Sequence, residues 1–200
     1  MAWVNEAVLA EIRRCYGDPR ELRIELEIGR AERDLVVGSG RSGRRHDVTF
    51  FVLNGDRLAL IQKPHYEPGL WRPPGGGLRP GEDFVAGVIR EALEELGVTI
   101  ALERYLVDVD AVFTHRGERI AWRTHVFSAR TEAEKLTPLD RHEISAARWG
   151  SVEELAGPIR ERLLATGRAL WSYRVRLHEA ALAELASGSA ERPTTPLPPA

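Results

Sequence analysis

The order of apolar patterns along the chain predicts an α+β sandwich. Short apolar runs with the length or alternation of strands lie on both sides of residues 83–96, whose apolar side chains recur with the period of a helix. Further helical spacing follows from residue 159. Hydrophobic residues make up 43% of the 200 residues, which is enough for a sizeable core. Strands around a central helix, followed by more helices, are typical of the α+β class.

Residues 1–45 are expected to form an N-terminal extension with one helix and one strand. Residues 2–15 place their apolar side chains on one helix face, and residues 22–28 alternate apolar with charged side chains. This strand could pair with the core sheet or with a second subunit. A turn-rich basic stretch follows at residues 38–46.

The main domain is expected at residues 46–187. Residues 48–53 and 58–61 form a predicted β-hairpin, because the Asn54-Gly55 pair between them favours a tight turn. Ten of the eighteen residues in 64–81 are Pro or Gly, which predicts an ordered loop before the helix of residues 83–96. Later strands are predicted at residues 98–106, 107–115, 119–129 and 144–149, with one or two helices over residues 159–185. Residues 188–200 are rich in Pro and are expected to form a disordered tail.

Composition excludes several classes of function. The net charge of −2 leaves no basic coat for gripping duplex nucleic acid. A single cysteine, Cys15, rules out a disulfide framework and a cysteine zinc site, and it is expected to be a small buried residue. No apolar stretch of about 18 residues could span a bilayer, and the N-terminus lacks the pattern of a signal peptide. We therefore expect a cytoplasmic protein without a membrane partner.

Three glutamates lie together at the edge of the apolar face of the predicted helix 83–96. Like charges three or four residues apart destabilise an isolated helix by about 0.2–0.5 kcal/mol per pair, and a divalent cation would remove that repulsion. Such a run is also common on an ordinary solvated helix face. The glycines at residues 75–77, just before the helix, favour a site, because phosphate oxygens and metal ions can approach bare backbone closely. The glutamates are Glu91, Glu94 and Glu95.

This stretch resembles the signature of the Nudix hydrolases, G-x(5)-E-x(7)-R-E-U-x-E-E-x-G-U, in which U is aliphatic. All seven fixed positions match, an agreement that arises by chance in about one window per 10⁸ at ordinary residue usage. The matching residues are Gly76, Glu82, Arg90, Glu91, Glu94, Glu95 and Gly97. The resemblance implies an α/β/α sandwich with a mixed sheet and a catalytic loop and helix over roughly residues 46–185.

The resemblance also implies hydrolysis of a diphosphate linkage in a nucleoside diphosphate derivative, with Mg²⁺ or Mn²⁺ as cofactor. Glu91 and Glu95 then correspond to the principal metal ligands, and Glu94 to a further ligand or to the proton acceptor for the attacking water. The Gly75 carbonyl corresponds to a backbone ligand. Structural roles are implied for Gly76, Glu82, Arg90 and Gly97.

Residues outside the signature have two interpretations each. Glu143 ends the late loop, residues 131–143. Some family members supply a catalytic or metal-binding glutamate from an equivalent loop, although Glu132, Glu134 and Asp140 compete for that role here. Arg44 and Arg45 could hold substrate phosphates or lie in a solvated linker. Trp71 could pack under the loop or stack on a base.

The expected partner is a small nucleotide-type substrate. Because members of the family commonly form dimers, the resemblance also implies a possible homodimer. The same signature is also compatible with three other functions. These are a sensor module that binds nucleotides without cleaving them, an isomerase acting on isopentenyl diphosphate, and an RNA 5′-end pyrophosphohydrolase. The intact glutamates favour an enzyme over a sensor.

Overall fold

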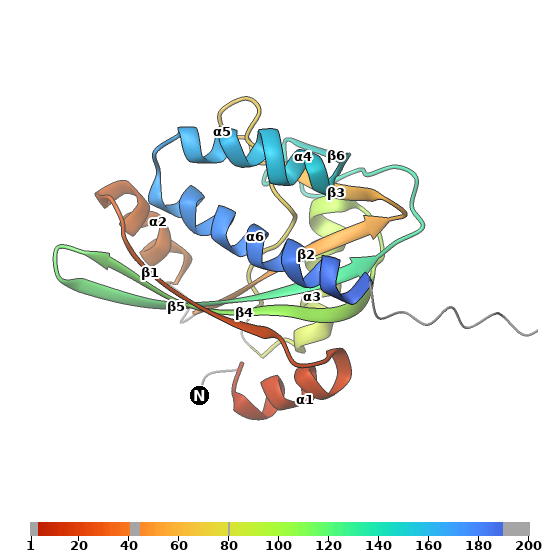
Figure 1. Cartoon of the computed structure of the whole chain (residues 1–200), viewed down its shortest axis with the longest axis horizontal. Coiled ribbons are helices and arrows are strands. Elements are labelled where there is room, and N and C mark those ends of the chain that lie inside the picture. Colours follow the sequence, from red (N-terminus) through yellow and green to blue (C-terminus); the bar gives the residue numbers. More distant parts are fainter. Residues whose placement is uncertain (1–3, 41–44, 80, 190–200) are drawn as a thin grey trace, which may run out of the picture.

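The computed structural model describes residues 4–40, 45–79 and 81–189. A six-stranded mixed sheet has the strand order β1-β4-β5-β2-β3-β6 (Figure 1). The strands are β1 Arg20–Glu27, β2 His46–Asn54, β3 Arg57–Gln62, β4 Ala101–His115, β5 Glu118–Arg130 and β6 Ala146–Ser151. The helices are α1 Glu6–Tyr16, α2 Arg30–Ser39, α3 Phe84–Leu96, α4 Val152–Glu154, a π-helical turn Leu155–Ile159, α5 Arg160–Ala165 and α6 Ala169–Ser189.

Helices cover both faces of this sheet. In β2, Phe51 packs into a core shared with α2, α5 and α6, while its neighbours Phe50 and Val52 pack into a second core shared with α1 and α3. A strand with both faces buried is apolar along its whole length, which is why residues 50–53 and 58–61 are nearly continuous apolar runs. The expected α+β sandwich with a mixed sheet is confirmed.

The N-terminal strand is part of the main sheet. β1 runs parallel to β4, with Arg20 opposite Val107 and Glu27 opposite Thr114. Of the two pairings open to the alternating segment, the structure therefore has the one within the same chain. The preceding α1 contributes Leu9 to the core that also contains α3.

Several expectations of local structure are wrong. Residues 98–115 do not form two strands, because β-bulges at residues 102–107 absorb extra residues and β4 continues through them. The basic stretch starting at Gly38 begins inside α2, and the predicted tail begins inside α6; the rest of that tail, residues 190–200, lies outside the described residues. Cys15 is exposed, since it lies on the outer side of α1. Among the described residues, no helix combines the length and apolar character needed to cross a membrane.

The helix α2 is absent from the elements that the sequence predicts, and one of the two contacts of its Glu32 is distant in sequence. Its buried Glu32 accepts a hydrogen bond from the backbone N–H of Gly29, which caps α2 itself, at 3.1 Å. The other carboxylate oxygen accepts the N–H of Leu170 at the start of α6, at 2.8 Å. One side chain thus caps two helices that are 138 residues apart in sequence.

We expect Glu32→Ala to lower the free energy of unfolding by about 1–3 kcal/mol, because two N–H groups at helix starts lose their acceptor. Urea denaturation followed by circular dichroism measures the change. The control is Glu161→Ala, which removes an exposed glutamate of α5 and should shift stability by less than about 0.5 kcal/mol. Equal stability of the two variants would contradict the double-cap interpretation.

Candidate active site

Gly97 joins the end of α3 to a later loop. Gly97 has a left-handed backbone (φ +71°), and a Cβ there would lie 1.9 Å from the carbonyl oxygen of Thr137. Thr137 in turn donates its N–H to the Leu96 carbonyl, and Asp140 donates its N–H to the Glu94 carbonyl. The glycine therefore allows the late loop to cap the helix end, which carries residues 137–143 next to the glutamates.

The loop before α3 lies along β2 as an irregular extra strand. Val48 donates its N–H to the Gly76 carbonyl at 2.9 Å, and Phe50 donates to the Pro74 carbonyl at 3.1 Å. A Cβ at Gly76 would lie 2.1 Å from Oε2 of Glu91. Only a residue without a side chain lets the loop backbone and this carboxylate touch.

Arg90 holds three carboxylates in place. Its guanidinium donates two hydrogen bonds to Glu82, at 2.7 and 3.0 Å, and one each to Glu91 at 2.9 Å and Glu94 at 2.7 Å. Arg79 also contacts Glu94, at 2.9 Å. The planar guanidinium can satisfy several carboxylates at once, so Arg90 fixes the orientation of the acidic helix face.

Glu91 and Glu95 are buried carboxylates. Glu95 is 1% exposed; its Oε2 accepts the Gly75 N–H at 2.6 Å, while its Oε1 accepts no hydrogen bond within the described part of the chain. Burial raises the pKa of Glu91 to about 7, against the opposing effect of Arg90. Burial also raises the pKa of Glu95, although the nearby Arg72 and Lys63 act in the other direction. Burial of both carboxylates disfavours their charged forms, so a bound cation would stabilise them.

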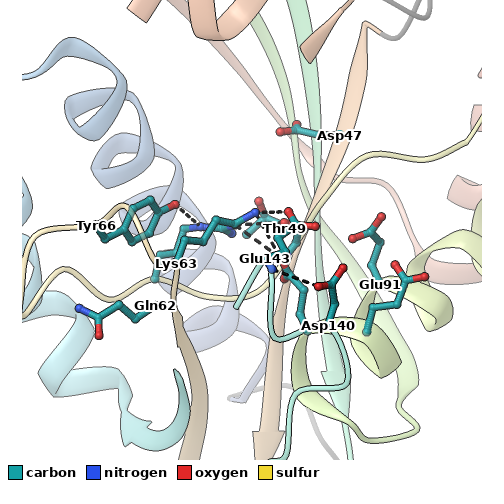
Figure 2. A network of polar contacts seen from close by, with 12 residues as sticks. Asp47, Thr49, Gln62, Lys63, Tyr66, Glu91, Asp140 and Glu143 are labelled. Carbon is teal, nitrogen blue, oxygen red and sulfur yellow. Dashed lines mark hydrogen bonds and ion pairs between the residues drawn. The ribbon is translucent and has the colours of Figure 1, made fainter. Parts of the chain in front are cut away.

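Glu143 faces the same pair of glutamates. Asp140 accepts the N–H groups of His142 and Glu143, each at 3.0 Å, and so fixes the turn at the end of the late loop. The Glu143 charge raises the pKa of both Glu91 and Glu95, as expected for a carboxylate that is close to them. In Figure 2, Glu143 meets Lys63 at the centre, with Glu91 on the side of α3.

Lys63 and Arg72 are neighbours of the glutamates that the sequence did not single out. Each places a nitrogen 3.7 Å from Oε1 of Glu95. Arg72 is 2% exposed and donates to the hydroxyl of Tyr66 and to the Gly75 carbonyl, at 3.0 and 3.2 Å. No local sequence signal marks them, because Lys63 follows the polar Gln62 and Arg72 follows the half-buried Trp71.

The predicted substrate residues lie at the edges of this region. Arg44 falls outside the described residues, and Arg45 is exposed, with its guanidinium 3.4 Å from the Gly40 carbonyl. Trp71 packs against the core, and the Arg148 guanidinium lies over its ring at 4.5 Å. Phosphate contact by the arginines and base stacking by Trp71 stay predictions.

Two glutamates of the acidic face, Glu91 and Glu95, fit a divalent cation. In residues 4–40, 45–79 and 81–189, no three carboxylate, imidazole or thiolate side chains converge as a ready ligand set. Glu94 is paired instead with Arg90 and Arg79, at 2.7 and 2.9 Å. Glu91 and Glu95 fit the group nevertheless: both are desolvated oxygen donors, and Oε1 of Glu95 lacks a hydrogen-bond partner.

Comparison with known families settles the ancestry of the domain. The family model described as NUDIX domain matches residues 43–169, more than half of the chain. The chain belongs to the NUDIX family. The matched region of this NUDIX chain contains the whole loop and helix that carry the signature, together with β2 to β6.

Curated relatives of this NUDIX chain include proteins named for RNA. The NAD-capped RNA hydrolase NudC of Stutzerimonas stutzeri is 31% identical over 113 residues, which cover 56% of this chain and 38% of that protein. The RNA pyrophosphohydrolase of Rhizobium meliloti is 29% identical over 146 residues, covering 62% and 87%. The chain thus spans well under half the length of its NudC relative.

A MutT NUDIX hydrolase from Burkholderia pseudomallei is 28% identical, covering 55% of this chain and 84% of that one, with a TM-score of 0.44.

We expect Gly76→Ala to weaken divalent-metal binding while the fold persists, because the new Cβ must push the Glu91 carboxylate aside. The measurement is the rise in melting temperature on addition of about 5–10 mM Mg²⁺. The control variant is Gly38→Ala, because a Cβ at residue 38 would meet nothing within 4 Å. A full metal-dependent rise in Gly76→Ala would contradict a site built on Glu91.

Proposed function

We propose that this NUDIX protein is a pyrophosphohydrolase that uses Mg²⁺ or Mn²⁺ to cleave a diphosphate linkage in a nucleoside diphosphate derivative. The observation that carries the proposal is the pair of buried glutamates on α3, pressed against the bare backbone of residues 75 and 76. Hydrolysis of a phosphoanhydride depends mainly on positioning and on neutralising the charge of phosphate oxygens. A cluster of carboxylates beside glycine backbone suits that task.

Glu91, Glu95 and the Gly75 carbonyl are the groups proposed to hold the metal. When bound, the ion would neutralise phosphate charge and make its bound water more acidic. Glu94 and Glu143 are the candidates for accepting a proton from the attacking water, because both reach the same helix face and remain partly open to solvent. Arg90 keeps Glu91 and Glu94 oriented, and Arg72 keeps the Gly75 carbonyl in place.

The substrate within this class is open to a direct screen. The names of the relatives from Stutzerimonas stutzeri and Rhizobium meliloti add NAD-capped RNA, and RNA that carries a pyrophosphate linkage, to the small nucleotides as candidates. If the protein is instead a sensor, a nucleotide should raise its melting temperature, and it should hydrolyse none of the candidate substrates. The cytoplasmic location, the small-molecule partner and a homodimer stay predictions.

We expect Glu95→Gln to keep the fold and to lower turnover at least about tenfold, because it removes one buried negative charge from the proposed metal site. Activity is measured with Mg²⁺ and with Mn²⁺ on nucleoside triphosphates, ADP-ribose, dinucleoside polyphosphates, sugar nucleotides and short RNA with modified 5′ ends. The control is Glu161→Gln on the exposed side of α5. Retention of most activity by Glu95→Gln would contradict the ligand assignment.

The double variant Arg44→Ala with Arg45→Ala tests the basic segment. If these arginines hold substrate phosphates, KM should rise strongly and kcat should change less, because such contacts form before the transition state as well as in it. The metal-dependent rise in melting temperature should remain. Unchanged KM would show that the segment is a solvated linker.

A further inference from the structure

Two cations flank Glu95, and they differ in how firmly they are held. The Arg72 guanidinium and the Lys63 ammonium both lie 3.7 Å from the same atom, Oε1 of Glu95. That atom accepts no hydrogen bond in the described structure. Both cations therefore act on Glu95 through charge alone, at a distance just beyond hydrogen bonding.

Arg72 is fixed by neutral partners. Its three nitrogens donate to the Tyr66 hydroxyl and to the carbonyls of Pro73 and Gly75, at 3.0, 2.9 and 3.2 Å. Its side chain is 3% exposed. None of these partners is a charged group, so a change of charge at Glu95 leaves the hydrogen bonds of Arg72 intact.

Within the described part of the chain, the Lys63 ammonium is held by carboxylates alone. Its ion-pair partners among the residues that the structure describes are Glu143 and Glu95. Its side chain is 15% exposed and Glu143 is 48% exposed, so the ammonium has a path to water. A flexible four-carbon stem and rotatable donors allow it to leave one partner without moving the backbone. Figure 2 shows the side chains of Lys63 and Glu143 meeting near the centre, with Glu91 to their right.

We infer that Lys63 is an exchangeable counter-ion that neutralises Glu95 and Glu143 until a divalent cation takes its place. The inference rests on the proposed metal site. A divalent cation bound at Glu95 would repel the Lys63 ammonium, which lies a few ångströms away, and the ammonium would turn outward. Lys63 then competes with the metal for negative charge, while Arg72 keeps the Gly75 loop in place throughout. Loss of the Lys63 charge should tighten metal binding, whereas ordinary damage to the site would weaken it.

The test is Mn²⁺ binding, measured by the electron paramagnetic resonance signal of free Mn²⁺ at low ionic strength with no substrate present. Lys63→Met keeps the apolar stem and removes the charge, and Lys63→Gln provides a second neutral variant. Both should bind Mn²⁺ with a dissociation constant about three- to tenfold lower than wild type. Lys63→Arg should stay near wild type, and circular dichroism confirms folding.

The matched control is Lys135→Met, which changes the only other lysine of the chain, an exposed residue of the late loop. It should leave the dissociation constant unchanged. An unchanged or higher dissociation constant in the folded neutral variants, with wild type binding Mn²⁺, would overturn the inference and leave the proposed function standing. Failure of wild type to bind Mn²⁺ would overturn both.

Discussion

The burial of Glu91 and Glu95 against the backbone of residues 74–77 is the contact on which the rest of the site depends. The glycine loop lies alongside β2 in space and precedes α3 in the chain, and Gly75 donates its N–H to Glu95. Glu91 could not lie this close to the loop if residue 76 carried a side chain. The cost of removing their charge from water is offset in part by Arg90, Arg72 and Lys63.

The fold places this contact between two cores. One core behind α3 contains Val88, Ala92 and Leu96, so the helix is anchored by one face while its glutamates lie at the edge. The opposite core holds α6, whose start is capped by Glu32 of α2. The N-terminal segment therefore contributes to the framework of the domain as well as adding β1 to the sheet.

The sequence allowed the central part of this arrangement to be predicted. The hairpin, the loop, the helix ending at Gly97 and the family all follow from local patterns, because turn residues and apolar periodicity act over short distances. Glu143 was one of four acidic candidates, and only the capping of α3 by the late loop brings it near Glu91. The helix α2 and the pair Lys63 and Arg72 depend on contacts between distant segments, for which a single sequence has no local signal.

Anomalous diffraction at the manganese edge, from crystals grown with Mn²⁺, tests most directly whether the buried carboxylates form a metal site. The account predicts one peak within coordination distance of the Glu91 and Glu95 carboxylates, on the side of the Gly75 carbonyl, with Lys63 turned away from Glu95. A structure in which Mn²⁺ binds only elsewhere, and in which Glu95 keeps Lys63 and Arg72 as its only neighbouring cations, would contradict it.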